Sequence, residues 1–134
     1  FHAPGCNMNI PDNLKYAASH EWVRVDNGDV VTVGISDYAQ LEMTELVYVE
    51  LPEVGRTFNA NDEVAVVESV KSASDIYTPV SGEIVEVNES LTDNPAKVNE
   101  SPFNDGWLFK IRLSDPAELD ALLDPDGYRA KISS

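Results

Sequence analysis

The chain has 134 residues, the usual length of a single domain, and it is strongly acidic, with nine Lys and Arg against 24 Asp and Glu and a net charge of −15. A surface of that sign repels phosphate groups, which argues against nucleic acid and anionic membranes as partners. No apolar run approaches the ~20 residues that cross a bilayer, so we expect a globular protein without a membrane segment. The acidic surface either favours solubility or steers the protein toward enzymes with basic patches, and both interpretations stay open.

Residues 1–7 precede Met8 and differ in character from the rest of the chain. They have neither the Arg-rich character of a transit peptide nor the apolar run of a secretion signal. We expect them to be a remnant, disordered or left over from expression, with the stub of a processed targeting segment as the alternative, and we expect a single domain over residues 8–134. The only cysteine, Cys6, lies in this stretch and has no partner for an internal disulfide, so nothing indicates an oxidising compartment.

The first third of the chain predicts a short helical turn, a hairpin and a helix. Residues 11–18 allow the turn. Residues 21–25 alternate apolar and polar side chains, Asn27-Gly28 is the favoured pair for a type I′ turn, and residues 30–35 return as the second strand. Ser36 is then predicted to be the N-cap of a helix. The apolar face of that helix is predicted to contain Tyr38, Ala39, Leu41 and Leu46.

Five short apolar stretches follow, separated by Gly, Pro, Asn and Asp. They predict strands at residues 46–51, 63–70, 74–80, 83–88 and 107–113. Even spacing of this kind is typical of an antiparallel sandwich or a small barrel. The two stretches of similar size on either side of Lys71 favour two sheets that face each other.

The last twenty residues change from strand-like to helical character. Asp115 followed by Pro116 and Glu118 is a helix start of the capping type. An apolar stripe follows, formed by Leu119, Leu122 and Leu123. A further helical turn is predicted after Pro125, with Tyr128 buried.

A search for catalytic motifs finds none in the sequence. There is no CxxC, HExxH or GxSxG motif and no glycine-rich phosphate loop. Of the two histidines, His2 lies in the N-terminal stretch outside the predicted domain, and His20 alone makes neither a metal site nor a catalytic triad. The sequence therefore predicts no catalytic and no metal-ligating residue.

One lysine stands apart from these negative findings. The segment ESVKSASD sets Lys71 between two predicted strands, among the small residues Ser69, Ser72, Ala73 and Ser74. At the apex of a hairpin its flexible stem would present a free amine, and small neighbours would leave room for the active site of another protein. Spacing alone leaves an ordinary surface lysine in a turn as the alternative.

Five blocks of sequence resemble, in order and spacing, the H protein family of the glycine cleavage system, over about residues 11–130. They are KYAASHEWVRV, VTVGISDYAQ, VYVELPEVG, ESVKSASDIYTPVSGEIVEVN and DGWLFKI. The resemblance implies a mainly β, hybrid barrel-sandwich fold of two antiparallel sheets with short peripheral and C-terminal helices. It also implies that lipoate is joined to Lys71 as an amide.

The resemblance further implies a non-catalytic carrier. Such a carrier shuttles an aminomethyl group and reducing equivalents between the pyridoxal-phosphate enzyme glycine decarboxylase, a tetrahydrofolate-dependent aminomethyltransferase and dihydrolipoyl dehydrogenase. Lipoate-attaching enzymes would be further partners. We expect a monomer in the bacterial cytoplasm, with the mitochondrial matrix as the alternative.

The resemblance also implies a cleft for the loaded arm, to which Glu21 and Asp75 contribute together with Ser19 and Tyr38. An aminomethyl group is a cation near pH 7, so carboxylates would hold it, and a cleft would exclude the water that hydrolyses it. For each acid, a solvated surface carboxylate is the alternative. The chain departs from the family at Tyr38, where histidine is common, and at Thr44-Glu45, where a glycine followed by an acid is common.

Other carriers fit the sequence less well. A biotin carrier normally has methionines beside its lysine, whereas Lys71 has Val70 and Ser72. A lipoyl domain of a 2-oxoacid dehydrogenase usually has an Asp before the lysine and a flexible linker, and neither is present. An interaction module with an unmodified lysine and a lipoate donor to other carriers stay open.

Overall fold

The computed structural model describes residues 14–17, 20–39, 45–70, 73–101, 103 and 106–133. Several sequence predictions lie outside these residues and stay predictions: those for residues 1–7, Ser19, Leu41, Thr44, Lys71 and Ser72. The strands are β1 (Lys15–Tyr16), β2 (Glu21–Asn27), β3 (Val30–Ile35), β4 (Leu46–Glu50), β5 (Thr57–Phe58), β6 (Glu63–Ser69), β7 (Ala73–Tyr77), β8 (Gly82–Val87) and β9 (Phe109–Leu113). The helices are α2 (Ser90–Asp93), α3 (Ala96–Glu100), the 3-10 helix η2 (Pro116–Ala121) and α4 (Pro125–Ser133).

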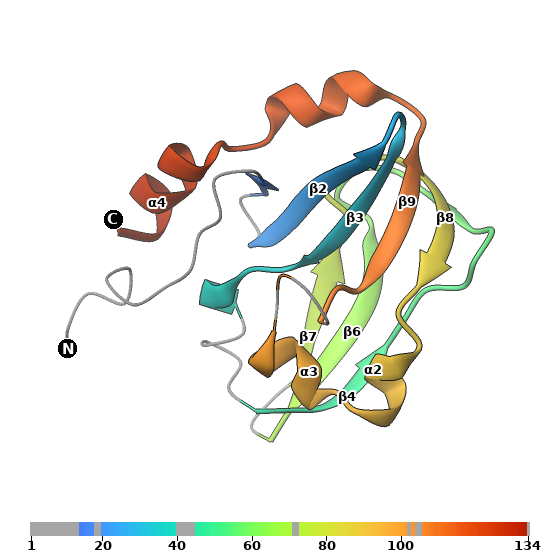
Figure 1. The fold of residues 1–134 in the computed structure, drawn as a ribbon, viewed down its shortest axis with the longest axis vertical. Coiled ribbons are helices and arrows are strands. Elements are labelled where there is room, and N and C mark those ends of the chain that lie inside the picture. Colours follow the sequence, from blue (N-terminus) through green and yellow to red (C-terminus); the bar gives the residue numbers. More distant parts are fainter. Residues whose placement is uncertain are drawn as a thin grey trace.

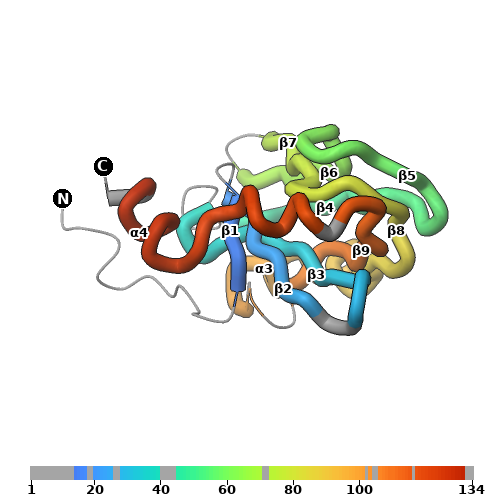
Figure 2. Tube along the Cα trace, turned by 90° about the horizontal axis from the view of Figure 1, so that it is seen from above, coloured from blue at the N-terminus to red at the C-terminus, as the bar shows by residue number. Residues whose placement is uncertain are grey.

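The described strands form two antiparallel sheets (Figure 1). The larger sheet has the order β1-β2-β3-β9-β8-β5 and the smaller one the order β4-β6-β7. Seen from above, β6 and β7 lie on one side of the molecule and β2 and β3 on the other (Figure 2). The prediction of a mainly β fold with two antiparallel sheets and short peripheral helices is confirmed. The two stretches that flank Lys71 do belong to facing sheets, since β6 lies in the smaller sheet and β8 in the larger one.

The main core fills the space between the sheets. Its central members come from both sheets and are fully or almost fully buried: Val31, Val33, Val67, Ile76, Ile84, Phe109 and Ile111. A second apolar cluster contains Leu14, Tyr16, Trp22, Phe103 and Tyr128. Successive side chains of a strand point to opposite faces, so Val23 joins the main core while Trp22 joins the second cluster. The larger sheet is therefore buried on both faces near the start of β2.

The predicted β2–β3 hairpin is confirmed, but its turn lies one residue later than predicted. Asn27 pairs with Val30, which leaves Gly28 and Asp29 as the turn residues, and the register shifts between Val25 and Asn27. Gly28 has φ of 60°, a value that glycine adopts without steric cost. The register shift between Val25 and Asn27 is a bulge that adds one residue to β2. Asn27 therefore pairs within the hairpin, and the favoured Asn-Gly pair does not form the turn itself.

The helical turn predicted for residues 11–18 is wrong at Lys15–Tyr16, which form strand β1. The reason is long-range pairing. The backbone of Tyr16 exchanges hydrogen bonds of 2.8 and 2.7 Å with Leu123, and Tyr16 also pairs with Trp22. Two extended neighbours at this position outweigh a weak local preference for helix.

The helix predicted after Ser36 is confirmed at its start. Residues 37–39 are helical, and the backbone N–H of Ala39 donates to Ser36 Oγ at 3.2 Å, so Ser36 is the N-cap. Leu46, however, begins β4 instead of lying on a helix face.

The C-terminal predictions are confirmed with one change in geometry. Asp115 caps a helix by accepting from the N–H of Ala117, but the helix is the 3-10 helix η2. Glu118 contacts another element, accepting from the backbone N–H and the hydroxyl of Ser81 at 2.6 and 2.8 Å. Tyr128 in α4 is 0% exposed, as predicted.

Candidate functional site

The β6–β7 hairpin carries the segment that the sequence singled out. Glu68 pairs with Ala73 across the two strands, so Lys71 lies in the segment that joins them, outside the described residues. Val70 is 66% exposed and its N–H donates to the carbonyl of Glu45 at 3.3 Å. Ala73 is exposed as well. The described residues on both sides of the lysine segment are thus open to solvent.

The two candidate acids lie in different environments. Asp75 is exposed on β7 opposite Val66, and its neighbour Ile76 points into the main core. Glu21 is the first residue of β2, pairs with Ile35 and is only 2% exposed. Asp75 is therefore as exposed as the alternative of a solvated surface carboxylate requires, whereas Glu21 is too buried for that alternative. In the described part of the chain, no hydrogen bond or ion pair joins Asp75 to Glu21.

Glu21, the first residue of β2, belongs to a compact group of polar and aromatic side chains. We call this group the Tyr128 cluster and define it as His20, Glu21, Ser36, Tyr38 and Tyr128. His20 Nδ1 lies 2.9 Å from the Tyr128 hydroxyl, and Ser36 Oγ lies 2.6 Å from the same oxygen. The His20 ring is 4.7 Å from the Tyr38 ring and 5.7 Å from the Tyr128 ring, between centroids. The structure therefore brings two of the predicted cleft residues, Glu21 and Tyr38, to one place and leaves Asp75 on the other sheet.

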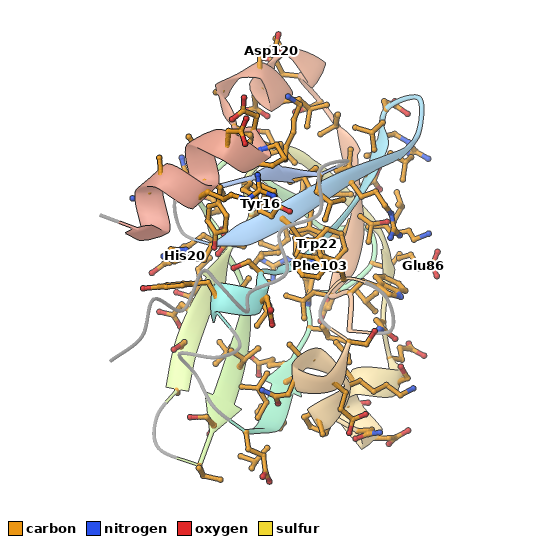
Figure 3. The ribbon with its side chains drawn as sticks, turned by 60° about the vertical axis from the view of Figure 1, so that its left-hand side comes forward. Tyr16, His20, Trp22, Glu86, Phe103 and Asp120 are labelled. Carbon is orange, nitrogen blue, oxygen red and sulfur yellow. The ribbon has the colours of Figure 1, made fainter. Side chains whose placement is uncertain are left out.

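The second apolar cluster supports this group from one side. The Tyr128 ring stacks on Tyr16 with 4.6 Å between centroids and 8° between planes, and Trp22 packs 5.9 Å from Phe103. Figure 3 shows Trp22 next to Phe103 and Tyr16 close to α4. Because Trp22 follows Glu21 directly, this packing also fixes the start of β2.

The surroundings of the Tyr128 hydroxyl disfavour a negative charge. The pKa of Tyr128 is raised from 10.0 to about 12, mainly by burial; the nearby Tyr38, Glu21 and Asp37 add to the rise, and the hydrogen bond with Ser36 opposes it. Burial opposes a charge of either sign, whereas the nearby carboxylates Glu21 and Asp37 would attract a cation. The resemblance implied such a role for Glu21, and the structure places Asp37 close enough to act on the same hydroxyl.

Sequence reasoning missed the part that Tyr128 and Ser36 have in this cluster. It predicted a buried Tyr128 and an N-cap at Ser36, but it gave no reason to bring them together. Ser36 and His20 lie 92 and 108 positions before Tyr128 in the sequence, and both contact its hydroxyl. The available signal was a tyrosine, predicted to be buried, in a short C-terminal helix.

A hollow of about 430 Å³ is lined in part by Tyr16, Ala17, Asn61, Pro79 and Leu122. None of Glu21, Tyr38 or Asp75 lines it. Within the residues that the structure describes, no three His, Cys, Asp or Glu side chains are arranged to hold a metal ion. None of the described helices has the length and apolar character needed to span a bilayer.

Fold and sequence define a small domain of two antiparallel sheets, with Lys71 in the segment that joins β6 and β7 and a separate polar and aromatic cluster around Tyr128. The family model "Glycine cleavage H-protein" matches residues 14–134. The glycine cleavage system H proteins of Alcanivorax borkumensis and Stenotrophomonas maltophilia are 62% and 59% identical to the chain, covering 93% and 89% of it and 97% and 91% of their own lengths. A crystal structure of a glycine cleavage system H protein from Mycobacterium marinum matches with a TM-score of 0.83 at 38% identity, covering 91% of this chain and 98% of that one. The chain belongs to the glycine cleavage H-protein family.

Proposed function

We propose that this protein is the lipoyl carrier of a glycine cleavage system and that Lys71 carries lipoate as an amide. Membership of the H-protein family and the segment ESVKSASD at the β6–β7 hairpin carry the proposal. The H proteins named above come from bacteria, which supports the bacterial cytoplasm as its compartment. The carrier is a monomer and has no catalytic residues of its own.

The residues near Lys71 fit the attachment of such an arm. Only a primary amine forms the amide, and the other lysines belong to strands or helices: Lys15 in β1, Lys97 in α3, Lys110 in β9 and Lys131 in α4. Val70 and Ala73, the nearest described neighbours, are exposed, so an attaching enzyme has access from solvent. The acidic surface, with a net charge of −15, would attract partner enzymes through basic patches.

The lipoyl group, when bound, would supply a disulfide: one sulfur would take the aminomethyl group as the S–S bond breaks and the other would become a thiol, and the dithiol left after transfer would be reoxidised. The partners that act on it are glycine decarboxylase, aminomethyltransferase and dihydrolipoyl dehydrogenase, and lipoate-attaching enzymes load it. The chain's own residues supply the environment. Glu21 contributes a buried negative charge near the Tyr128 cluster, Asp75 contributes an exposed one on β7, and Tyr38, with Ser19, completes the set. Together they favour a cationic load and keep water from it.

The test is a single substitution at the attachment site. Lys71→Arg and the control Lys97→Arg, together with the parent, are incubated with a lipoate-attaching enzyme, lipoate and ATP, and intact masses are recorded. The parent and the control should gain one lipoyl increment and Lys71→Arg none, with the circular dichroism of all three unchanged. A lipoyl increment on Lys71→Arg would refute the assignment.

A further inference from the structure

The C-terminal helix α4 has one described side chain that is fully buried, and that side chain is Tyr128. The other described side chains of α4 are exposed or half-buried. Tyr128 is 0% exposed, and its ring stacks on Tyr16 of β1. A ring alone would satisfy this packing, so the hydroxyl needs a separate explanation.

The hydroxyl joins two segments that are distant in sequence. On one side it contacts His20 Nδ1 at 2.9 Å, and on the other Ser36 Oγ at 2.6 Å. Ser36 Oγ in turn accepts from the N–H of Ala39 at 3.2 Å. A consistent chain therefore runs from Ala39 N–H to the Ser36 hydroxyl, from there to the Tyr128 hydroxyl, and from Tyr128 to an unprotonated His20 Nδ1. Because burial keeps the pKa of Tyr128 at about 12, the phenol retains its proton throughout the physiological range.

Each of the two joined segments carries a residue of the proposed arm site. His20 directly precedes Glu21, and Ser36 caps the helical residues that include Tyr38. His20 also has φ of 77°, which is uncommon for a residue other than glycine and persists only where its surroundings fix it. The surroundings do so through the backbone as well, since the N–H of Ser36 donates to the carbonyl of His20 at 2.9 Å.

We infer that Tyr128 is a positioning residue of the arm site: its hydroxyl holds the His20–Glu21 segment and the Ser36–Tyr38 segment in the arrangement that shelters the loaded lipoyl arm. The inference rests on the proposed function. It assigns to α4, a helix at the far end of the chain, a part in how long the adduct survives. Tyr128 itself need not touch the arm.

The experiment compares Tyr128→Phe, which keeps the stacked ring and removes the hydroxyl, with the control Tyr48→Phe on the exposed β4 tyrosine. The first readout is amide hydrogen exchange in the unlipoylated proteins. The Ser36 and Ala39 amides should exchange about 3- to 10-fold faster in Tyr128→Phe, the loss expected for one buried hydrogen bond, while the Leu108 amide, bonded to Val33 in the main core, should be unchanged. A uniform acceleration that includes Leu108 would mean that Tyr128 only stabilises the fold, and it would overturn the inference.

The second readout is the lifetime of the loaded arm. Lipoylated proteins are loaded with glycine and glycine decarboxylase, and the release of ammonia and formaldehyde is followed without the transferase; each release consumes one water and leaves a free thiol. Release should be about 3- to 10-fold faster in Tyr128→Phe than in the parent and the control, with equal lipoylation of all three. Equal lifetimes in the parent and in Tyr128→Phe would overturn the inference alone.

Failure of the proposed function gives a different result. In that case the parent takes up no lipoate, or its adduct decays as fast as the adduct of free dihydrolipoamide, whereas the exchange data still test the contacts of Tyr128. Should Tyr128→Phe fail to fold, Ser36→Ala removes the same link from the other side and leaves the stack on Tyr16 intact. The same local acceleration of exchange and of release is expected, and its absence overturns the inference.

Discussion

Gly34 in β3 should not tolerate even one additional carbon, because the Trp22 ring lies over it. Trp22 and Gly34 are directly paired across the β2–β3 hairpin. A Cβ on residue 34 would lie 2.6, 2.7 and 2.8 Å from Cζ2, Cε2 and Nε1 of Trp22. Favourable contacts between carbons are about 3.5–4.0 Å. The ring is 0% exposed and packs against Phe103, so it cannot move away without disturbing the second apolar cluster.

The expected cost of Gly34→Ala follows from these contacts. Overpacking of this kind lowers the free energy of unfolding by about 1–3 kcal/mol. Alanine recovers part of that, up to about 1 kcal/mol, because glycine loses more backbone entropy on folding. We expect a net loss of about 1–2 kcal/mol, measured by urea denaturation, and a fall in melting temperature of about 3–10 °C. Because Glu21 precedes Trp22, the start of β2 should also shift, which near-ultraviolet circular dichroism of the tryptophan reports.

A double-mutant cycle separates the clash from other causes. In the Trp22→Leu background the ring is gone and the added methyl group has room, so Gly34→Ala should cost nothing or stabilise slightly, although Trp22→Leu alone is strongly destabilising. The interaction free energy of the cycle should therefore reach about 1 kcal/mol or more. If the two costs simply add, the ring is not the reason that glycine occupies position 34.

The remaining predictions concern the charge and the proton at the Tyr128 cluster. Glu21→Gln keeps the shape and removes the charge, so lipoylation of Lys71 should be unchanged. Release from the loaded arm should be about fivefold faster, equivalent to ~1 kcal/mol, and faster again with Asp75→Asn added. Adduct lifetimes equal to that of the parent in both variants would show that the carboxylates do not hold the load. The pKa of Tyr128 rises from 10.0 in the unfolded chain to about 12 in the folded protein, so the folded state binds the proton more tightly and stability falls as the pH rises from 10 to 12. The free energies of unfolding measured by urea titration at pH 9 and pH 12 should differ by about 2–3 kcal/mol because of this group, and Tyr128→Phe should remove that difference. The same pH dependence in Tyr128→Phe as in the parent would contradict the prediction.

The parts of the fold that were predictable are those written in local patterns. Period-2 alternation in residues 21–25 and 30–35 gave both strands of the first hairpin, because a strand buried on one face repeats its apolar residues every second position. The cap at Ser36 and the start of η2 at Asp115 were predictable for the same reason, since each depends on a side chain within three residues of the N–H that it accepts. Local chemistry also located Lys71 between two strands.

The parts that were missed are short or depend on distant partners. Helices α2 and α3 have four and five residues, fewer than the two turns that a helical period needs to become visible. Strand β5 has two residues, and β1 exists only because Tyr16 finds Trp22 on one side and Leu123 on the other. No window along the sequence contains both partners.

The same division applies to the proposed arm site. The sequence singled out the lysine and the resemblance supplied the acids, whereas the arrangement depends on contacts such as those of the Tyr128 hydroxyl with Ser36 and His20, 92 and 108 positions before it. Burial also distinguishes the two acids, which the sequence alone does not. The carboxylate of Glu21 is 2% exposed, so it acts through a much lower dielectric constant than the exposed carboxylate of Asp75. If both acids influence a cationic load, Glu21 should therefore have the larger effect for each charge removed, and comparison of Glu21→Gln with Asp75→Asn alone measures that ratio. A larger effect at Asp75 would mean that the load lies at the surface of β7, away from the Tyr128 cluster.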